Sequence, residues 1–103
     1  MTSLLGPLLR ADEPAPGEVR LCGELDVCGE AALAAHLEAV AARHDRVVVD
    51  CAGLTFADLR GARALLDVAR RRPRTALVVR RPPPSLAVVL AFLDVRGAPL
   101  PGQ

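Results

Sequence analysis

Lysine, tryptophan and tyrosine are absent from this chain, and Phe56 and Phe92 are its only large aromatic side chains. A core without large rings must be built from leucine, valine and alanine, and the half-hydrophobic composition supplies them. The lack of aromatic stacking residues argues against single-stranded nucleic acid, and we do not expect nucleic acid as a partner. Every basic residue other than histidine is an arginine, which is typical of a GC-rich bacterial genome.

Long hydrophobic runs are also missing. No apolar stretch approaches the roughly 18 residues that a membrane-spanning helix requires. The N-terminus, MTSLLGPLLR, has no basic residue ahead of its apolar ones and does not fit a signal peptide. We therefore expect one soluble, cytoplasmic domain over residues 1–103, with no membrane partner.

Cysteine is scarce, and the three cysteines lack the CxxC spacing of a metal site. We expect reduced thiols that pack as small hydrophobic residues, and neither a metal nor a cofactor. The alternative is a redox role for Cys28, which would be exposed near a helix start. A nucleophilic site could be drawn from Cys51, His44 and Asp50, but no glycine-rich loop accompanies it, and we do not expect an enzyme.

The remaining pattern alternates short apolar runs with stretches of helical spacing. We expect strands at Leu4–Arg10, Val19–Cys22, Val47–Val49 and Thr75–Val79, and helices at Gly29–Arg43, Leu59–Arg71 and Ser85–Leu93. Such alternation predicts an α/β fold, with a four- or five-stranded mixed sheet and three helices packed mainly on one side.

Four short features mark the expected boundaries of these elements. Prolines and a glycine make Ala11–Gly17 a turn, and Gly23–Asp26 ends the second strand. Asp58 is placed to cap the second helix, because its carboxylate can accept from the free N–H groups of the first turn. Ser85 is expected to cap the third helix in the same way.

Several blocks, in this order, resemble the signature of STAS domains, the fold of bacterial anti-sigma factor antagonists. The blocks are Gly23–Asp26, Val47–Asp58, Gly61–Leu66 and Pro84–Gly97. The resemblance spans about residues 4–100 and implies a STAS-like sheet. Pro99 and Pro101 forbid the closing helix that is usual in the family, so we expect a shortened C-terminus. The sheet surface left uncovered could bind a second copy or another protein.

The resemblance fails at the family's switch position. In typical antagonists a serine directly after the Asp58 position is phosphorylated by the partner kinase. Here Leu59 has no hydroxyl, and the positive charge of Arg60 excludes mimicry of a phosphate. Either the domain stays permanently competent to bind, or the two larger side chains abolish the usual docking and the domain serves another partner.

Thr55 and Ser85 are the nearest remaining hydroxyls and stand as secondary candidates for phosphorylation. For each of them we expect a structural role first. Thr55 would bond its own loop backbone, and Ser85 would be the helix cap already described.

The sequence thus predicts a non-catalytic regulatory module that binds a protein such as an anti-sigma factor kinase, without the usual serine switch. The alternatives are a small-ligand or nucleotide sensor, and a structural subunit of a larger assembly. By the resemblance, the residues expected to contact the partner are Asp26, Thr55, Asp58, Leu59, Arg60, Gly61 and Arg63.

Overall fold

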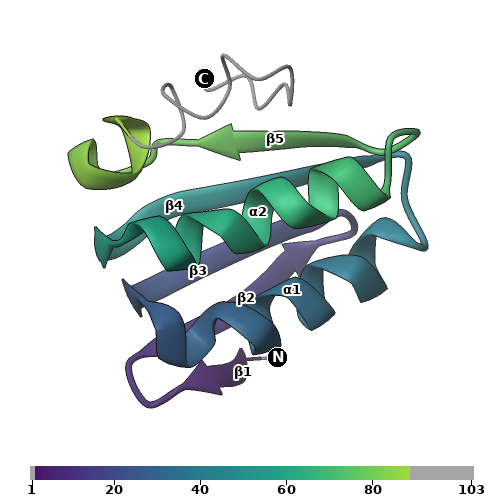
Figure 1. Ribbon diagram of the computed structural model, residues 1–103. Helices are drawn as coiled ribbons and strands as arrows, with labels where there is room; N and C mark the ends of the chain where they lie inside the picture. The colour runs from purple at the N-terminus through teal and green to yellow at the C-terminus, as the bar shows by residue number, and fades with distance from the viewer. Residues whose placement is uncertain (1, 89–103) are drawn as a thin grey trace.

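The computed structural model describes residues 2–88, which form a five-stranded mixed sheet with two long helices on one face (Figure 1). The expected α/β class is confirmed. The strands are β1 (Thr2–Gly6), β2 (Leu9–Ala15), β3 (Glu18–Leu25), β4 (Arg46–Ala57) and β5 (Ala76–Arg80). The helices are α1 (Val27–Ala41) and α2 (Leu59–Arg71), and residues 84–88 are also helical.

The strands lie in the order of the sequence, β1-β2-β3-β4-β5. The pairs β1–β2 and β2–β3 are antiparallel, whereas β3–β4 and β4–β5 are parallel and are connected through α1 and α2. Parallel pairing requires a crossover connection, and both crossover helices lie on the same face of the sheet. The carboxyl ends of β3 and β4 therefore meet the first turns of α1 and α2 at one end of the molecule.

The core lies between the sheet and the two helices and contains no aromatic side chain among the described residues. In α1 the apolar residues at helical spacing are buried, with Leu33, Leu37 and Val40 no more than 1% exposed. The second helix begins and ends as predicted, and its Leu65 and Leu66 are likewise buried. The remaining fully buried large side chains come mainly from the strands: Leu9, Val19, Leu21, Leu25, Val47 and Val49.

The predictions for the N-terminal segment, one edge strand followed by a turn, were wrong. Instead of one edge strand over Leu4–Arg10, the chain forms a hairpin whose turn contains Pro7. The segment Ala11–Gly17, expected as a turn, belongs to β2 as far as Ala15. Pro14 is tolerated inside β2 because the β2–β3 register shifts there, so its missing N–H interrupts no regular pairing.

The central strands are longer than predicted. Gly23–Asp26 was expected to end β3, but the strand continues through Leu25, which is fully buried. It passes Gly23 at φ 106, a backbone conformation that glycine adopts readily, and an added Cβ there would overlap the Leu8 carbonyl oxygen. Similarly β4 does not end near Asp50. It runs to Ala57 and includes most of the segment expected as a loop.

The third helical segment starts one residue earlier than predicted. Residues 84–88 are helical, so Ser85 lies within the first turn and is not its cap. Leu86 is fully buried. The rest of the helix predicted as far as Leu93, and the shortened C-terminus, lie outside the described residues.

Candidate functional site

The candidate site is the end of the molecule where β3 and β4 finish and the two long helices begin, on the left in Figure 1. Leu25 pairs with Ala57, the last residue of β4. The Asp58 N–H then donates to the Leu25 carbonyl oxygen at 3.0 Å. This contact fixes the entry into α2 against β3, and we call the region the helix-start end (residues 24–30 and 54–63).

Two of the predicted site residues are helix caps. The Cys28 N–H donates to Asp26 Oδ1 at 3.0 Å, and the Gly61 N–H donates to Asp58 Oδ1 at 2.8 Å. Each carboxylate satisfies an otherwise free backbone donor in the first turn of its helix. The predicted cap at Asp58 is confirmed. Both carboxylates are only partly buried, so their negative charge is still presented at this end.

Gly61 serves close packing rather than surface contact. It is buried, and a Cβ placed on it would lie 2.6 Å from Leu25 Cγ and 2.8 Å from the Leu25 carbonyl oxygen. Only glycine lets the first turn of α2 approach β3 this closely. It offers no side chain to a partner.

Leu59, Arg60 and Arg63, in contrast, are exposed on the first turns of α2. Leu59 is 51% exposed and leaves the start of the helix regular. Arg60 Nε lies 3.8 Å from Glu30 Oε1, an ion pair that connects the first turns of the two helices across the surface. The pair is exposed and adds little to stability.

The two remaining hydroxyls at this end are both engaged. Thr55 Oγ1 donates to the Gly23 carbonyl oxygen on β3 at 3.2 Å. The expectation that Thr55 bonds its own loop was therefore wrong, because this segment is strand. Ser85 Oγ accepts a hydrogen bond from the Ala57 N–H at 3.4 Å and holds residues 84–88 beside the end of β4. Both side chains belong to exposed residues.

Large apolar side chains from five separate segments are exposed around this end. They are 45–69% exposed, and we call them the apolar patch: Leu8, Val27, Phe56, Leu59 and Val88. Exposed apolar side chains that gather in one region mark interaction surfaces.

Two hydrogen bonds and one helix start place the outlying members of the apolar patch at this end. Leu8 is anchored because its carbonyl oxygen accepts from the Glu24 N–H at 2.8 Å. Val27 is the first residue of α1. Val88 belongs to the helical segment that Ser85 attaches to Ala57.

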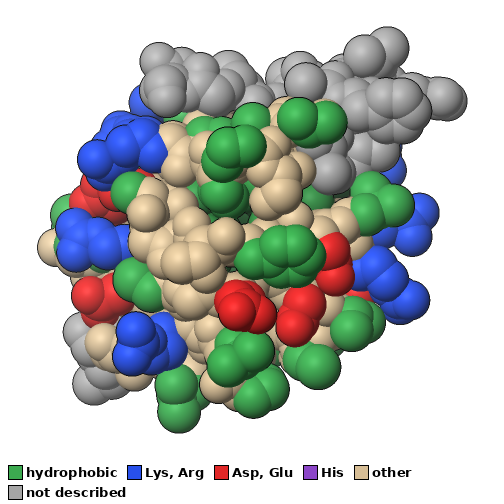
Figure 2. Space-filling model, turned by 90° about the vertical axis from the view of Figure 1, so that its left-hand side faces the viewer, with side chains coloured by type: hydrophobic (Ala, Val, Ile, Leu, Met, Phe, Trp, Pro, Cys, Tyr) green, Lys and Arg blue, Asp and Glu red, His purple; other side chains and the backbone are tan. Residues whose placement is uncertain are grey.

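Figure 2 looks onto this end of the molecule. Hydrophobic side chains spread across it, acidic side chains lie between them near the centre, and arginines lie toward the margins. The carboxylates that belong to the helix-start end are Glu24, Asp26, Glu30 and Asp58. Leu59 was among the predicted contact residues, but the other members of the apolar patch were not, and Leu8, Val27 and Val88 are distant from it along the chain. The one signal of the apolar patch in the sequence is an apolar residue next to a turn or a helix cap.

Asp50 lies away from this end and has a structural role. It is 4% exposed, accepts from the Ala52 N–H at 3.0 Å and binds the guanidinium of Arg81. Burial pushes the pKa of Asp50 upward, but the Ala52 hydrogen bond and the nearby arginines outweigh it. The net pKa is lowered from the ordinary 3.8, and the carboxylate stays ionised at neutral pH.

The nucleophilic site considered from the sequence is not supported by the geometry. Burial raises the pKa of Cys51 to about 12, and the adjacent Asp50 charge adds to the effect. Such a thiol remains protonated and unreactive near neutral pH. His44 precedes the start of β4, whereas Cys51 lies in the middle of that strand. Within residues 2–88, no three His, Cys, Asp or Glu side chains are grouped to hold a metal ion.

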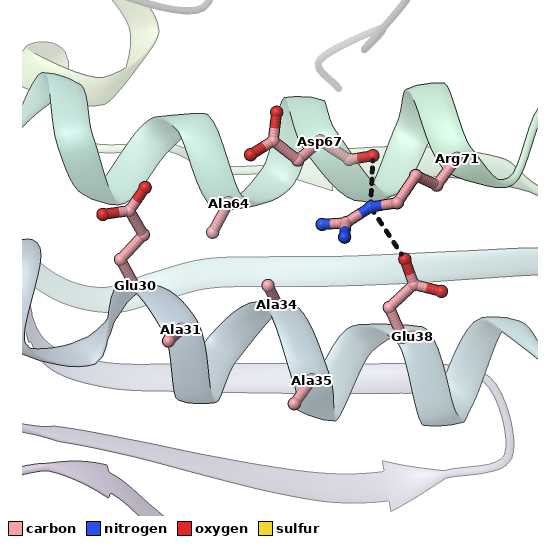
Figure 3. A pocket seen from close by; sticks show the side chains of 8 residues that line it. All are labelled: Glu30, Ala31, Ala34, Ala35, Glu38, Ala64, Asp67 and Arg71. Atoms are coloured by element: carbon pink, nitrogen blue, oxygen red, sulfur yellow. Dashed lines mark hydrogen bonds and ion pairs between the residues drawn. The ribbon is translucent and has the colours of Figure 1, made fainter.

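A groove of about 390 Å³ runs between α1 and α2 on the outer side of the helix layer (Figure 3). Its floor is alanine, and Ala34 and Ala64 point toward each other across it. Its rim carries Glu30, Glu38 and Asp67. The one arginine on the rim, Arg71, is already bound: its Nε lies 3.2 Å from Glu38 Oε2 and donates to the Asp67 carbonyl oxygen at 3.3 Å.

Among the described residues, no helix is long and apolar enough to cross a membrane.

Comparisons with known proteins agree on the fold. The family model described as "Mlab, STAS domain" matches residues 9–101. The anti-sigma factor antagonist SpoIIAA in its unphosphorylated form gives a TM-score of 0.69 at 16% identity, over 92% of this chain and 87% of that chain. An anti-sigma factor antagonist from Mycobacterium paratuberculosis gives 0.72 at 20% identity, over 96% and 89%. No curated protein sequence matches.

Proposed function

This chain belongs to the STAS family, and on that premise we propose that it is a non-catalytic regulatory module that binds a protein through the apolar patch. The partner class is an anti-sigma factor kinase or a related anti-sigma protein, since both similar structures are anti-sigma factor antagonists. Sigma factors act in the cytoplasm, so we assign the protein to that compartment.

The observation that carries the proposal is the apolar patch itself. Residues such as Phe56 and Leu59 leave about half of their surface in water at an end that is otherwise well packed. Their exposure costs free energy that a partner would recover, at roughly 25 cal/mol per Å² of apolar surface buried. A large exposed aromatic ring is a suitable anchor for a binding site.

The geometry favours a permanently competent surface over an abolished one. Leu59 is exposed without disturbing the capped start of α2, and Arg60 is directed to Glu30. Leu59 therefore enlarges the apolar patch, where a serine would have interrupted it. Without a hydroxyl at this position, the interface has no phosphorylation switch there.

The groove between α1 and α2 does not favour the nucleotide-sensing alternative. A nucleotide brings negative phosphates, whereas the rim holds the carboxylates of Glu30, Glu38 and Asp67. Arg71, which could offset them, is engaged by Glu38. The phosphates and these carboxylates carry charges of the same sign and would repel each other.

Binding to a purified anti-sigma factor kinase, measured by calorimetry, tests the proposal. We expect Phe56→Ser and Leu59→Ser each to weaken affinity about tenfold, which corresponds to about 1.4 kcal/mol. Leu4→Ser is the matched control, because Leu4 is an exposed leucine on β1, outside the apolar patch. Equal affinities for all variants and the wild type would place the binding surface elsewhere.

A second arm tests the missing switch. The kinase and ATP are added to the wild type and to the double variant Leu59→Ser/Arg60→Ser. We expect phosphate on residue 59 of the variant only, detected by mass spectrometry of the peptide. If the kinase binds the double variant but never phosphorylates the restored serine, the partner is not of the anti-sigma kinase class.

A further inference from the structure

We propose that the protein forms a weak homodimer through the outer edge of β1, independently of the partner that the apolar patch binds. β1 lies at the margin of the sheet, and only β2 pairs with it among the described strands. Its outer row of backbone N–H and C=O groups is a template for another strand. A second copy of β1, running antiparallel, supplies the matching row.

The composition of β1 is unusual for an edge strand. Natural sheets protect their edges with charged side chains or prolines, which make pairing with another chain unfavourable. β1 reads Thr-Ser-Leu-Leu-Gly and has no charge and no proline. β5, at the other margin of the described sheet, has Arg80 as its last residue. Of the two margins of the described sheet, only β1 has no charged residue.

Leu4 provides an independent observation. It is 77% exposed, more than any other large hydrophobic side chain among the described residues. Leu5 faces the core, so alternation along the strand puts Leu4 on the sheet face opposite the helices. The other positions on that side are mostly polar or charged, including Arg10, Asp12 and Arg20.

These charges make the open face itself a poor dimer surface, so we place the contact at the edge of β1. Antiparallel pairing of two identical strands places equivalent residues near a twofold axis, where a charged residue would repel its own copy. β1 brings none. The register shift at Leu5 and the turn at Pro7 limit the paired stretch to about Thr2–Leu4, so the dimer is weak.

Pairing through β1 would determine how the apolar patches of the two copies are arranged. A twofold axis perpendicular to the sheet keeps the helices of both copies on one face and joins the two sheets into one. β1 runs parallel to β3, because each is antiparallel to β2. The two apolar patches would therefore point in opposite directions, and the dimer would present two separate partner sites. Such bivalence raises avidity for clustered partners.

Sedimentation of the full chain alone, from about 10 µM to about 1 mM, tests the proposal because weak association depends on concentration. We expect the mass to rise from 10.8 kDa toward twice that value. Leu4→Glu should remove the rise, since it puts two carboxylates near the axis. Leu8→Glu, an equivalent change in the adjacent turn, should not.

Two further measurements check that the variants are folded and locate the contact between the copies. Circular dichroism and the unfolding midpoint should show that both variants stay folded, because both side chains are exposed. Hydrogen exchange should slow in residues 2–6 as the concentration rises. A monomer at every concentration, or association that Leu4→Glu leaves intact, would overturn the proposal. None of these measurements involves a partner protein, so they stand apart from the test of the proposed function.

Discussion

The guanidinium of Arg81 donates to the buried carboxylate of Asp50, 31 residues earlier in the chain. Arg81 has φ 53, in the left-handed region that few non-glycine residues occupy. The ion pair thus connects the middle of β4 to the residue at which the chain leaves β5. From there the chain reaches Ser85, which bonds the end of β4.

We expect Asp50→Asn to destabilise the fold by about 1–3 kcal/mol in urea unfolding, because the charge that Arg81 binds is lost while the amide oxygen can still accept from Ala52. Arg81→Gly is the companion variant, since glycine adopts the same backbone conformation while the whole side chain, with its guanidinium, is removed. Its effect should be smaller, because the Arg81 side chain is 60% exposed. An unchanged midpoint for Asp50→Asn would contradict the structural role of this carboxylate.

The same carboxylate predicts a pH dependence. Its folded pKa lies below the ordinary 3.8, so the unfolded state binds the proton more tightly. The stabilisation is therefore complete well above pH 3.8 and is lost as the pH falls through the folded pKa. We expect the stability difference between wild type and Asp50→Asn to be constant near neutral pH and to shrink below about pH 4. A difference that grows on acidification would reverse the assigned sign.

Gly61→Ala should destabilise the protein by about 1–3 kcal/mol, although alanine is the better helix former by about 1 kcal/mol. The added Cβ would meet Leu25 at 2.6 Å, so strand or helix must shift. Gly6→Ala is a milder comparison, since its nearest contact would be 3.4 Å. Thermal unfolding of the two variants ranks them, and a stabilised Gly61→Ala protein would show that the α2–β3 contact is looser than described.

The helix caps can be separated from the charge at the helix-start end. Asp58→Ala removes the acceptor for the Gly61 N–H and should cost about 1 kcal/mol of unfolding free energy. Asp58→Asn keeps an acceptor oxygen and should cost only a few tenths. Urea unfolding of the two variants separates the contribution of the capping hydrogen bond from that of the negative charge. Equal losses for Ala and Asn would attribute the effect to charge alone.

The three thiols should differ in reactivity. Cys28 is exposed, Cys22 is partly buried and Cys51 is buried with a pKa of about 12. With iodoacetamide at pH 8 we expect rapid labelling of Cys28 and none of Cys51 until urea unfolds the protein. Peptide mass spectrometry identifies the labelled sites. Native labelling of Cys51 as fast as Cys28 would mean that β4 opens readily.

Predictions that rest on neighbouring residues agree with the structure. The spacing of Leu33, Leu37 and Val40 gave the buried stripe of α1, and Asp58 marked the start of α2. Helical periodicity and capping involve residues within one or two turns, so a single segment contains the whole signal. The alternation of strand and helix patterns likewise indicated the mixed sheet.

Predictions that depended on distant partners were less accurate. β4 looked complete near Asp50, yet it continues because Gly53 to Ala57 find backbone partners on β3. The hairpin of β1 and β2 was predicted as a single strand, because the sequence does not show that Ser3 and Ala11 pair. Ser85 looked like a cap but bonds Ala57 across 28 residues. Cross-strand contacts of this kind are set by the sheet as a whole.

The sequence by itself determined the α/β class, the resemblance to STAS domains and the presence of a leucine, which has no hydroxyl, at position 59, because composition, periodicity and motif residues are local properties. Only the tertiary structure shows which surface Leu59 is part of. Folding brings it together with Leu8, Val27, Phe56 and Val88, so that a single exposed leucine becomes part of an apolar patch. The physical reason is that a surface is defined by distances in space, which the parallel pairing of β3 and β4 fixes.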